Sequence, residues 1–356
     1  MTHTNQKSGY IAYFDILRVI SMFGVLFMHL SSARLAAVGG AGWYAVAAFD
    51  SFFYTAVPIF MMISGALILS APQAQDIRYL LRHRLPRLIV PLLVWSAGTL
   101  AIDNAAAFVH GEGFGIAQYL QELSAIALHE AAPPYWFLYY LIPLYLLSPL
   151  LSAAAKGMSE KTWRYLGILA FIVVFYKTAA ALFPDKLGRI EILERLFLFS
   201  GCAAYFFFGY RLHHTRVKVK NGVLLGIIAA DLVLITWMTG VLSDGSNLDQ
   251  TVQSYNLLFT SILSVSLFLL IKQNIEKIPQ TIQRVSRRLS GHSFCVYLSH
   301  VPVILLLPSI GIDISTWAGF LLSIPITTAI CLAISAIAVR IRPLCYILTG
   351  TRYKKL

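Results

Sequence analysis

Long apolar segments recur along the whole chain, and they constrain its fold more than any other feature of the sequence. Each segment, folded as an α-helix, is long enough to cross a hydrocarbon core of about 30 Å. The composition agrees, since 58% of the residues are hydrophobic, only 12% are charged and the mean hydropathy is +0.71. We therefore expect an all-α, polytopic membrane helical bundle of about ten transmembrane helices, in a single integral-membrane domain over residues 1–356. The expected spans cover residues 11–36, 46–69, 87–108, 135–154, 163–183, 192–211, 221–242, 252–271, 289–309 and 315–340.

Basic residues gather in every second loop between these spans. Cytoplasmic loops of membrane proteins collect Lys and Arg, so the alternation predicts that both termini are cytoplasmic. The loop 109–134 has no Lys or Arg but carries Glu112, Glu122 and Glu130, and we expect it on the opposite side. The same rule accounts for the net charge of +12, which therefore does not indicate a nucleic-acid partner. The partner that the composition indicates is the lipid bilayer.

The first span carries three ionisable residues: Asp15, Arg18 and His29. The eleven-residue step from Arg18 to His29 turns an α-helix by ~1100°, within about 20° of three full circles, and rises roughly 16 Å. Asp15 lies about 40° from His29 on the same stripe. Ionisable groups inside a membrane are costly and normally face a cavity or a partner. If Arg18 sits at one headgroup layer, His29 therefore sits near the bilayer centre.

Each residue of this stripe has a chemistry that suits a reaction site. A neutral imidazole in an enclosed site can take a proton from a hydroxyl, so His29 is a candidate base; the alternative is a hydrogen-bonded packing residue. Arg18 stays protonated and suits a phosphate or carboxylate. Asp15, one turn away, could hold the guanidinium of Arg18 in place.

A second group of basic residues lies at the cytoplasmic end of the third span, where Arg78, Arg82, Arg84 and Arg87 fall within ten residues. Four guanidinium groups beside a helix that carries Arg18 would suit a polyanion such as a nucleotide pyrophosphate. The alternative is an ordinary positive-inside anchor, and it carries more weight for Arg78 and Arg82 than for the other two.

Two later segments add candidates. The aromatic run over residues 133–140 includes Tyr135 and Trp136, and it is typical of an interfacial belt. The alternative is a stacking platform for a sugar acceptor, with Glu130 near it. His300 lies midway through the span 289–309 and could face the same cavity as His29, while Asp231 in the span 221–242 is a further buried-charge candidate.

Other features favour packing over chemistry. The pair Ser64-Gly65 in the second span permits close approach of two helices, which would bring this span against the first. The four cysteines form no Cys-x-x-Cys or Cys/His ligand pattern and are expected to be small buried residues. We expect no metal site and no tightly bound cofactor.

Five short motifs, in order along the chain, resemble those of the acyltransferase-3 family of integral-membrane O-acyltransferases, and the likeness covers nearly the whole sequence. Residues 135–151, with Ser148-Pro149-Leu150, are similar to the enterobacterial-common-antigen O-acetyltransferase branch. The motifs are Arg18-x10-His29, Phe60-Met61-Met62-Ile63-Ser64-Gly65, Arg84-x-x-Arg87 followed by Pro91, Trp136-Phe137-Leu138, and Val296-Tyr297-Leu298-Ser299-His300.

The resemblance implies a bacterial inner (cytoplasmic) membrane enzyme that takes an acyl group, usually acetyl, from cytoplasmic acyl-CoA. The acceptor would be a hydroxyl of a surface glycan or lipid-linked saccharide, with acetyl-CoA as co-substrate and no SGNH-type soluble domain in this chain. His29 would act as general base or transient acyl carrier. The implied roles are catalytic for His29, Asp15 and His300, CoA-binding for Arg18, Arg84, Arg87 and Arg82, and acceptor-binding for Trp136, Tyr135 and Glu130.

Two other classes remain open at this point. A glycan or lipid transporter would also carry ionisable residues near the bilayer midplane, although the sequence has no internal repeat and its Arg cluster is confined to the cytoplasmic side. A non-catalytic membrane subunit would have no reason to align Asp15, Arg18 and His29. The sequence is also compatible with a homo-oligomer.

Overall fold

The computed structural model describes residues 11–109, 115–188, 190–196, 199–245 and 247–353. Its described residues form an all-α bundle, in which the sole β-type pairing is an isolated bridge between Asp244 and Asn247. Within this part of the chain, eight helices are long and apolar enough to cross a membrane, or nine if one bent pair counts as a span. The expected polytopic membrane bundle is therefore confirmed.

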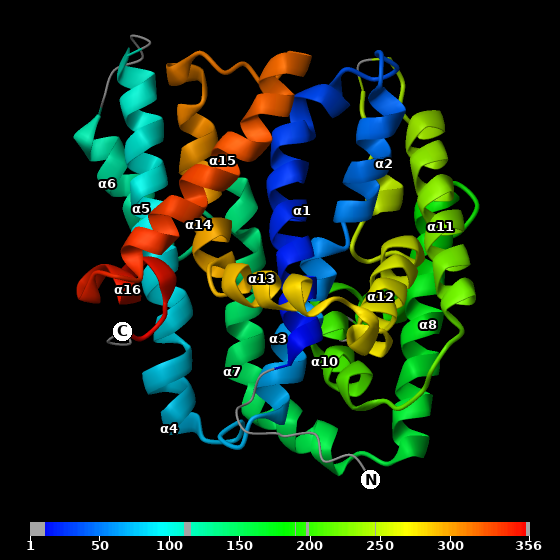
Figure 1. The fold of residues 1–356 in the computed structure, drawn as a ribbon. Coiled ribbons are helices and arrows are strands. Elements are labelled where there is room, and N and C mark those ends of the chain that lie inside the picture. Colours follow the sequence, from blue (N-terminus) through cyan, green and yellow to red (C-terminus); the bar gives the residue numbers. More distant parts are fainter. Residues whose placement is uncertain (1–10, 110–114, 189, 197–198, 246, 354–356) are drawn as a thin grey trace.

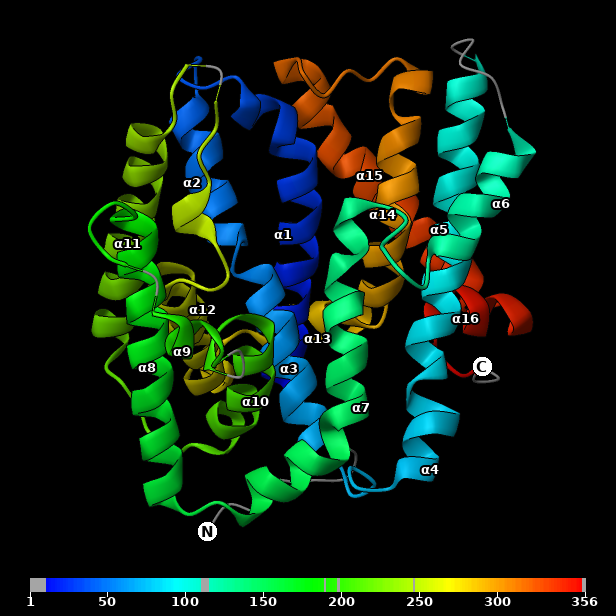
Figure 2. The same ribbon diagram turned by 180° about the vertical axis from the view of Figure 1, so that it is seen from behind.

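The helices match the expected spans closely, and Figures 1 and 2 show their arrangement from two sides. They are α1 (Ala12–Ala36), α2 (Trp43–Phe53) with α3 (Ala56–Ser70), α5 (Pro86–Val109), α7 (Trp136–Gly157), α8 (Glu160–Leu182), α10 (Gly201–His214), α11 (Asn221–Leu242), α12 (Leu258–Gln273), α14 (Ser293–Leu306) and α15 (Trp317–Ala338).

Three spans differ from the sequence-based expectation of ten regular crossings. The second span is broken at Tyr54 and Thr55, between α2 and α3. The sixth has only the 14 residues of α10, which extend about 21 Å and fall short of the hydrocarbon core. The ninth, α14, follows α13 (Gln280–Ser290) at a bend of 60°. Length alone therefore gives eight or nine crossings in the described chain.

Helix α1 lies at the centre of the bundle and contacts α2, α3, α12, α13, α14 and α15. Its apolar side chains share one large core with α3, α7 and α14, in which Leu17, Ile59, Leu138 and Leu298 have no exposed surface. A helix that is surrounded in this way can carry polar side chains into the interior, because none of its faces is given wholly to lipid.

The closest helix pair is α3 with α10, and glycine makes it possible. A Cβ at Gly65 would lie 1.7 Å from the carbonyl oxygen of Phe206, and one at Gly209 would lie 2.2 Å from that of Met62. Only residues without a side chain let two backbones approach so closely. The Ser64-Gly65 pair is thus a packing motif, as expected, and the direct neighbour of Gly65 is α10. Helix α3 also contacts α1, as the sequence predicted.

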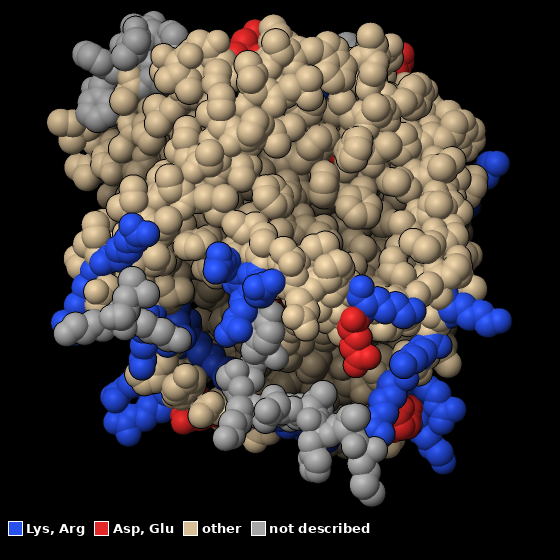
Figure 3. All heavy atoms as spheres, viewed as in Figure 1, with Lys and Arg blue, Asp and Glu red and all other residues tan. Residues whose placement is uncertain are grey.

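Basic side chains gather at one end of the bundle. In the view of Figure 3 most Lys and Arg side chains lie in the lower half, where α1 begins and the C-terminal helix α16 (Arg342–Thr349) lies. Helix α6 (Ile116–Ala125), which carries Glu122, lies at the opposite end; Glu112 lies outside the described residues. The distribution agrees with a cytoplasmic basic end, and below we call the two ends the basic end and the outer end.

Candidate active site

Two histidines from separate spans meet inside the bundle. The rings of His29 on α1 and His300 on α14 are stacked, with centroids 5.1 Å apart and an angle of 28° between their planes. His300 has no exposed surface, while His29 is half-buried. The structure therefore brings together two of the residues for which the sequence suggested catalytic roles.

The contacts of His300 fix which of its nitrogens carries a proton. Its Nδ1 lies in a short hydrogen bond with the backbone carbonyl oxygen of Tyr297. Because a carbonyl oxygen only accepts, Nδ1 must donate, and in the neutral ring Nε2 then carries the lone pair. This Nε2 is buried and has no hydrogen-bond partner among the described residues. It is therefore free to accept a proton or a hydrogen bond from a bound group.

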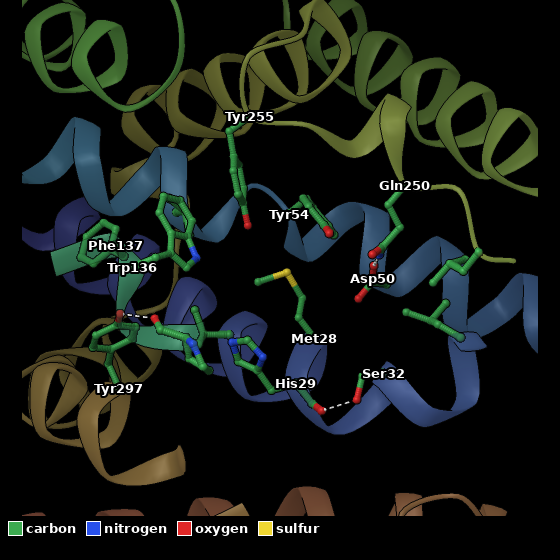
Figure 4. Close-up of a pocket in the computed structure, with 15 residues that line it drawn as sticks. Met28, His29, Ser32, Asp50, Tyr54, Trp136, Phe137, Gln250, Tyr255 and Tyr297 are labelled. Atoms are coloured by element: carbon green, nitrogen blue, oxygen red, sulfur yellow. Dashed lines mark hydrogen bonds between the residues drawn. The ribbon is translucent and has the colours of Figure 1, made fainter. Parts of the chain in front are cut away.

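A cavity of about 340 Å³ opens beside His29 in the outer half of the bundle (Figure 4). The side chains of Met28, His29, Tyr54 and Tyr255 reach into it. A smaller cavity of about 250 Å³ lies against both His29 and His300 and is bordered by the backbone of residues 131–134. His29 thus borders two spaces, and a molecule in either could reach its ring.

Asp50 of α2 is the carboxylate of the larger cavity, and the sequence analysis missed it. It is 1% exposed, and its oxygens lie 3.3 Å from Ser31 Oγ, 3.5 Å from Gln250 Nε2 and 3.4 Å from Gln253 Nε2. These contacts join α1, α2 and the segment before α12. The rule that flags ionisable groups in apolar spans applies to Asp50 as much as to Asp231, and could have found it.

Aromatic rings form one wall of this cavity. Tyr255 lies between Tyr54 and Trp136, with ring centroids 5.3 and 5.4 Å away. Trp136, which the aromatic run predicted as an acceptor-binding residue, therefore does line the cavity. A wall of rings beside the carboxylate of Asp50 and the amide of Gln250 suits a molecule that has both apolar faces and hydroxyl groups.

Two other residues predicted to bind an acceptor lie elsewhere. Tyr135 is fully buried; its hydroxyl donates to the carbonyl oxygen of Leu298 at 2.8 Å and lies 3.0 Å from the Thr99 hydroxyl. It therefore joins α5 and α14 and cannot contact a ligand in the cavity. Glu130 is exposed in the loop before α7 and borders neither cavity.

At the basic end, three of the predicted arginines converge. Tyr145 of α7 lies within electrostatic reach of Arg18, Arg84 and Arg87, so these residues share one region of the bundle. All three guanidinium-bearing residues are half-buried. The sequence analysis did not single out Tyr145.

Arg82 does not join this group. It is exposed and lies in η1 (Leu80–Arg84), a π-helical segment between α4 (Ile77–Tyr79) and α5. π-Helical turns are rare overall but common at functional sites, and this one changes the phase of the helix between Arg82 and α5. The wider turn separates the exposed Arg82 from the inward Arg84 and Arg87.

Asp15 acts on the basic end and not on His29. Its Oδ1 accepts a hydrogen bond of 2.5 Å from Ser290 Oγ of α13 and lies 3.8 Å from Arg18 Nη1. Fourteen residues separate it from His29, a rise of about 21 Å along α1. The structure thus places Asp15 beside Arg18, where it could hold the guanidinium in place, and away from His29.

Two further ionisable residues lie outside these sites. Asp231 is 8% exposed on α11 and borders neither cavity, although one of its oxygens has no partner in the described part of the chain. Glu194 forms an ion pair of 3.3 Å with Lys177. Neither Asp231 nor this ion pair lies on α1.

Comparison with known proteins identifies the family. A family model described as an acyltransferase domain matches residues 11–336, which include both histidines, Asp50 and the converging arginines. The comparisons with curated proteins and with solved structures found no match. Because the family model covers nearly the whole chain, and because the described helices form a membrane bundle, the chain belongs to the acyltransferase-3 family of multi-pass membrane acyltransferases.

Proposed function

We propose that the protein is an O-acyltransferase, in the simplest case an O-acetyltransferase of a bacterial inner membrane. It takes the acyl group from acyl-CoA at the basic end and gives it to a hydroxyl of a glycan or lipid-linked saccharide in the outer cavity. The observation that carries the proposal is that α1 presents Arg18 to the arginine group at one end and His29 to the outer cavity at the other.

The donor is proposed from the chemistry of the basic end. Arg18, Arg84 and Arg87 present guanidinium groups around Tyr145, and guanidinium groups bind phosphate oxygens in pairs of charged hydrogen bonds. Such a site suits the pyrophosphate of CoA. The pantetheine arm would then extend along α1 and place the thioester near His29, roughly 16 Å further along the axis.

The acceptor is proposed from the chemistry of the outer cavity. Rings such as Trp136 and Tyr255 can pack against the apolar face of a sugar, while Asp50 and Gln250 can exchange hydrogen bonds with its hydroxyl groups. Because the cavity lies on the side away from the arginines, acceptor and donor would approach His29 from opposite ends.

The reaction at His29 can follow one of two balanced routes. As general base, the imidazole takes the proton of the acceptor hydroxyl while its oxygen attacks the thioester carbonyl, and CoA leaves as a thiolate that the imidazolium protonates. As acyl carrier, a nitrogen of His29 attacks the thioester carbonyl, and CoA leaves as a thiolate that takes the ring proton. In a second step the acceptor hydroxyl attacks the acyl group, and its proton returns to the freed imidazole. In both routes His300 Nε2 can hold a hydrogen bond or a proton beside the reacting atoms.

A transporter of glycans or lipids is the second candidate, because two cavities meet at His29. A transporter would move the acceptor without any acyl donor. The enzyme would transfer label from acetyl-CoA and would do nothing to the acceptor without it.

Replacing His29 with Gln should abolish acyl transfer, because an amide keeps the polarity of the ring but takes up no proton. We expect a loss of ~10²–10⁴-fold in single-turnover transfer from radiolabelled acetyl-CoA, with CoA binding retained. His300→Gln should also lower the rate, by a smaller factor. His129→Gln, at an exposed loop position, is the matched control. A rate within about tenfold of the parent in His29→Gln would fall well short of the loss expected for a general base, and would make His29 a packing residue.

Replacing both Arg84 and Arg87 with Ala should weaken CoA binding, measured by calorimetry on the purified protein. Loss of a charged hydrogen bond costs about 1.5–3 kcal/mol, so each residue should contribute roughly tenfold or more to the affinity. Lys at both positions should rescue only in part, since an ammonium cannot bind phosphate through two parallel bonds. Arg78→Ala, exposed on the same approach, should bind CoA normally. Parent-like binding by the double Ala variant would rule out this donor site.

Replacing Asp50 with Asn should impair use of the acceptor and leave the donor side intact. The amide has nearly the same size but loses a charged acceptor, so we expect kcat/KM for the acceptor to fall by about 10–100-fold, as for one charged hydrogen bond. CoA affinity should not change. The control is Asp231→Asn, which alters a buried carboxylate outside the cavity. Equal effects of both variants on transfer would show that Asp50 acts through folding alone.

A further inference from the structure

The segment that follows α15 packs against the first part of α5, which carries Arg87. The indole Nε1 of Trp95 donates to the carbonyl oxygen of Leu348 at 3.0 Å. Gly350 has a positive φ of 63°, and a Cβ there would lie 2.2 Å from the carbonyl oxygen of Arg87. Residues 348–350 therefore press directly on the backbone that carries Arg87, and only glycine allows this approach.

A side-chain contact extends the same connection. Arg352 Nη2 lies 3.1 Å from His83 Nδ1. A guanidinium only donates, so Nδ1 of His83 is the acceptor in this contact. Since His83 directly precedes Arg84, the C-terminal segment lies beside the proposed donor site.

A cavity of about 470 Å³ lies between this segment, the end of α15 and the start of α14. Its wall contains two arginines and a histidine and no carboxylate; the lining residues are His292, Ala336, Val339, Arg340, Cys345, Thr351 and Arg352. His292 Nδ1 is held by a 2.8 Å hydrogen bond with Ser335 Oγ. Neither Arg340 nor Arg352 has an acidic partner in the part of the chain that the structure describes.

Cationic groups that converge without a carboxylate suit an anion, and guanidinium groups suit a phosphate above all. CoA carries two kinds of phosphate, a pyrophosphate and a separate 3′-phosphate on its ribose. The arginines around Tyr145 account for one of them. Most of the residues that line this cavity of about 470 Å³ lie beyond residue 336, where the match to the family model ends.

We propose that this cavity, formed by Arg340, Arg352 and His292, binds the 3′-phosphate of the CoA donor. The proposal rests on the acyl-CoA donor proposed above. The fastening of residues 348–352 to Arg87 and His83 would hold the two phosphate sites at a fixed separation, so that the enzyme recognises the whole nucleotide. An anionic lipid headgroup has related phosphate chemistry, and the experiment must separate the two ligands.

The test compares the affinities of CoA and dephospho-CoA, which lacks only the 3′-phosphate, for the full-length protein in detergent. The parent should prefer CoA by about tenfold or more, as expected for charged hydrogen bonds to one phosphate. The R340Q/R352Q variant should lose this preference while it still binds dephospho-CoA as the parent does. R342Q is the matched control, because Arg342 is exposed two residues from Arg340 and does not line the cavity.

Three results would overturn the proposal, and they differ from failure of the proposed function. One is a parent that binds both ligands equally, and another is a double variant that keeps the preference. The third is a double variant that keeps the preference for CoA but no longer binds phosphatidylglycerol, when binding is compared in nanodiscs with and without this lipid. That result would make the cavity a lipid site. If the parent binds neither nucleotide, the donor assignment fails first and this inference with it.

Discussion

The energetic cost of ionisable side chains inside a membrane is the constraint on which the rest of the structure depends. Arg18 and His29 lie on one helix, three turns apart, and neither could face lipid without a large penalty. The bundle places α1 at its centre, where six other helices contact it. Near the start of α1, Arg18 shares its surroundings with Tyr145, Arg84 and Arg87. Further along α1, His29 stacks on His300 and borders the outer cavity.

The packing of the neighbouring helices follows from that central position. Gly65 and Gly209 let α3 and α10 approach closely, while the break after α2 frees Tyr54 to reach the cavity. Tyr135 joins α5 to α14 through its hydroxyl, which holds the helix that carries His300. Residues first considered for chemistry, such as Tyr135 and Asp15, thus position those that border the cavities or face the phosphates.

Periodicity, hydropathy and loop charge predicted most of the helices to within a few residues, because these signals are local; α10 is the largest exception, since it begins nine residues after the expected start of its span. They also predicted the stripe on α1, since one helix fixes the spacing of its own residues. Contacts between distant segments were not predictable in this way. Asp50 meets Gln253, and His83 meets Arg352, across 203 and 269 positions. Likewise, the sequence does not reveal that the Tyr135 hydroxyl is hydrogen-bonded inside the bundle. Nor does it reveal that the neighbouring Trp136 is the residue that lines the cavity.

The central claim is that donor and acceptor reach His29 from opposite sides of the membrane. It is tested most directly in sealed proteoliposomes of known orientation, with lipid-linked saccharides from the host membrane present and radiolabelled acetyl-CoA supplied on one side only. We expect labelled saccharide, with its sugar on the opposite side, when acetyl-CoA is supplied at the basic end, and none when it is supplied at the outer end. Label that appears only on sugars on the same side as acetyl-CoA would contradict it.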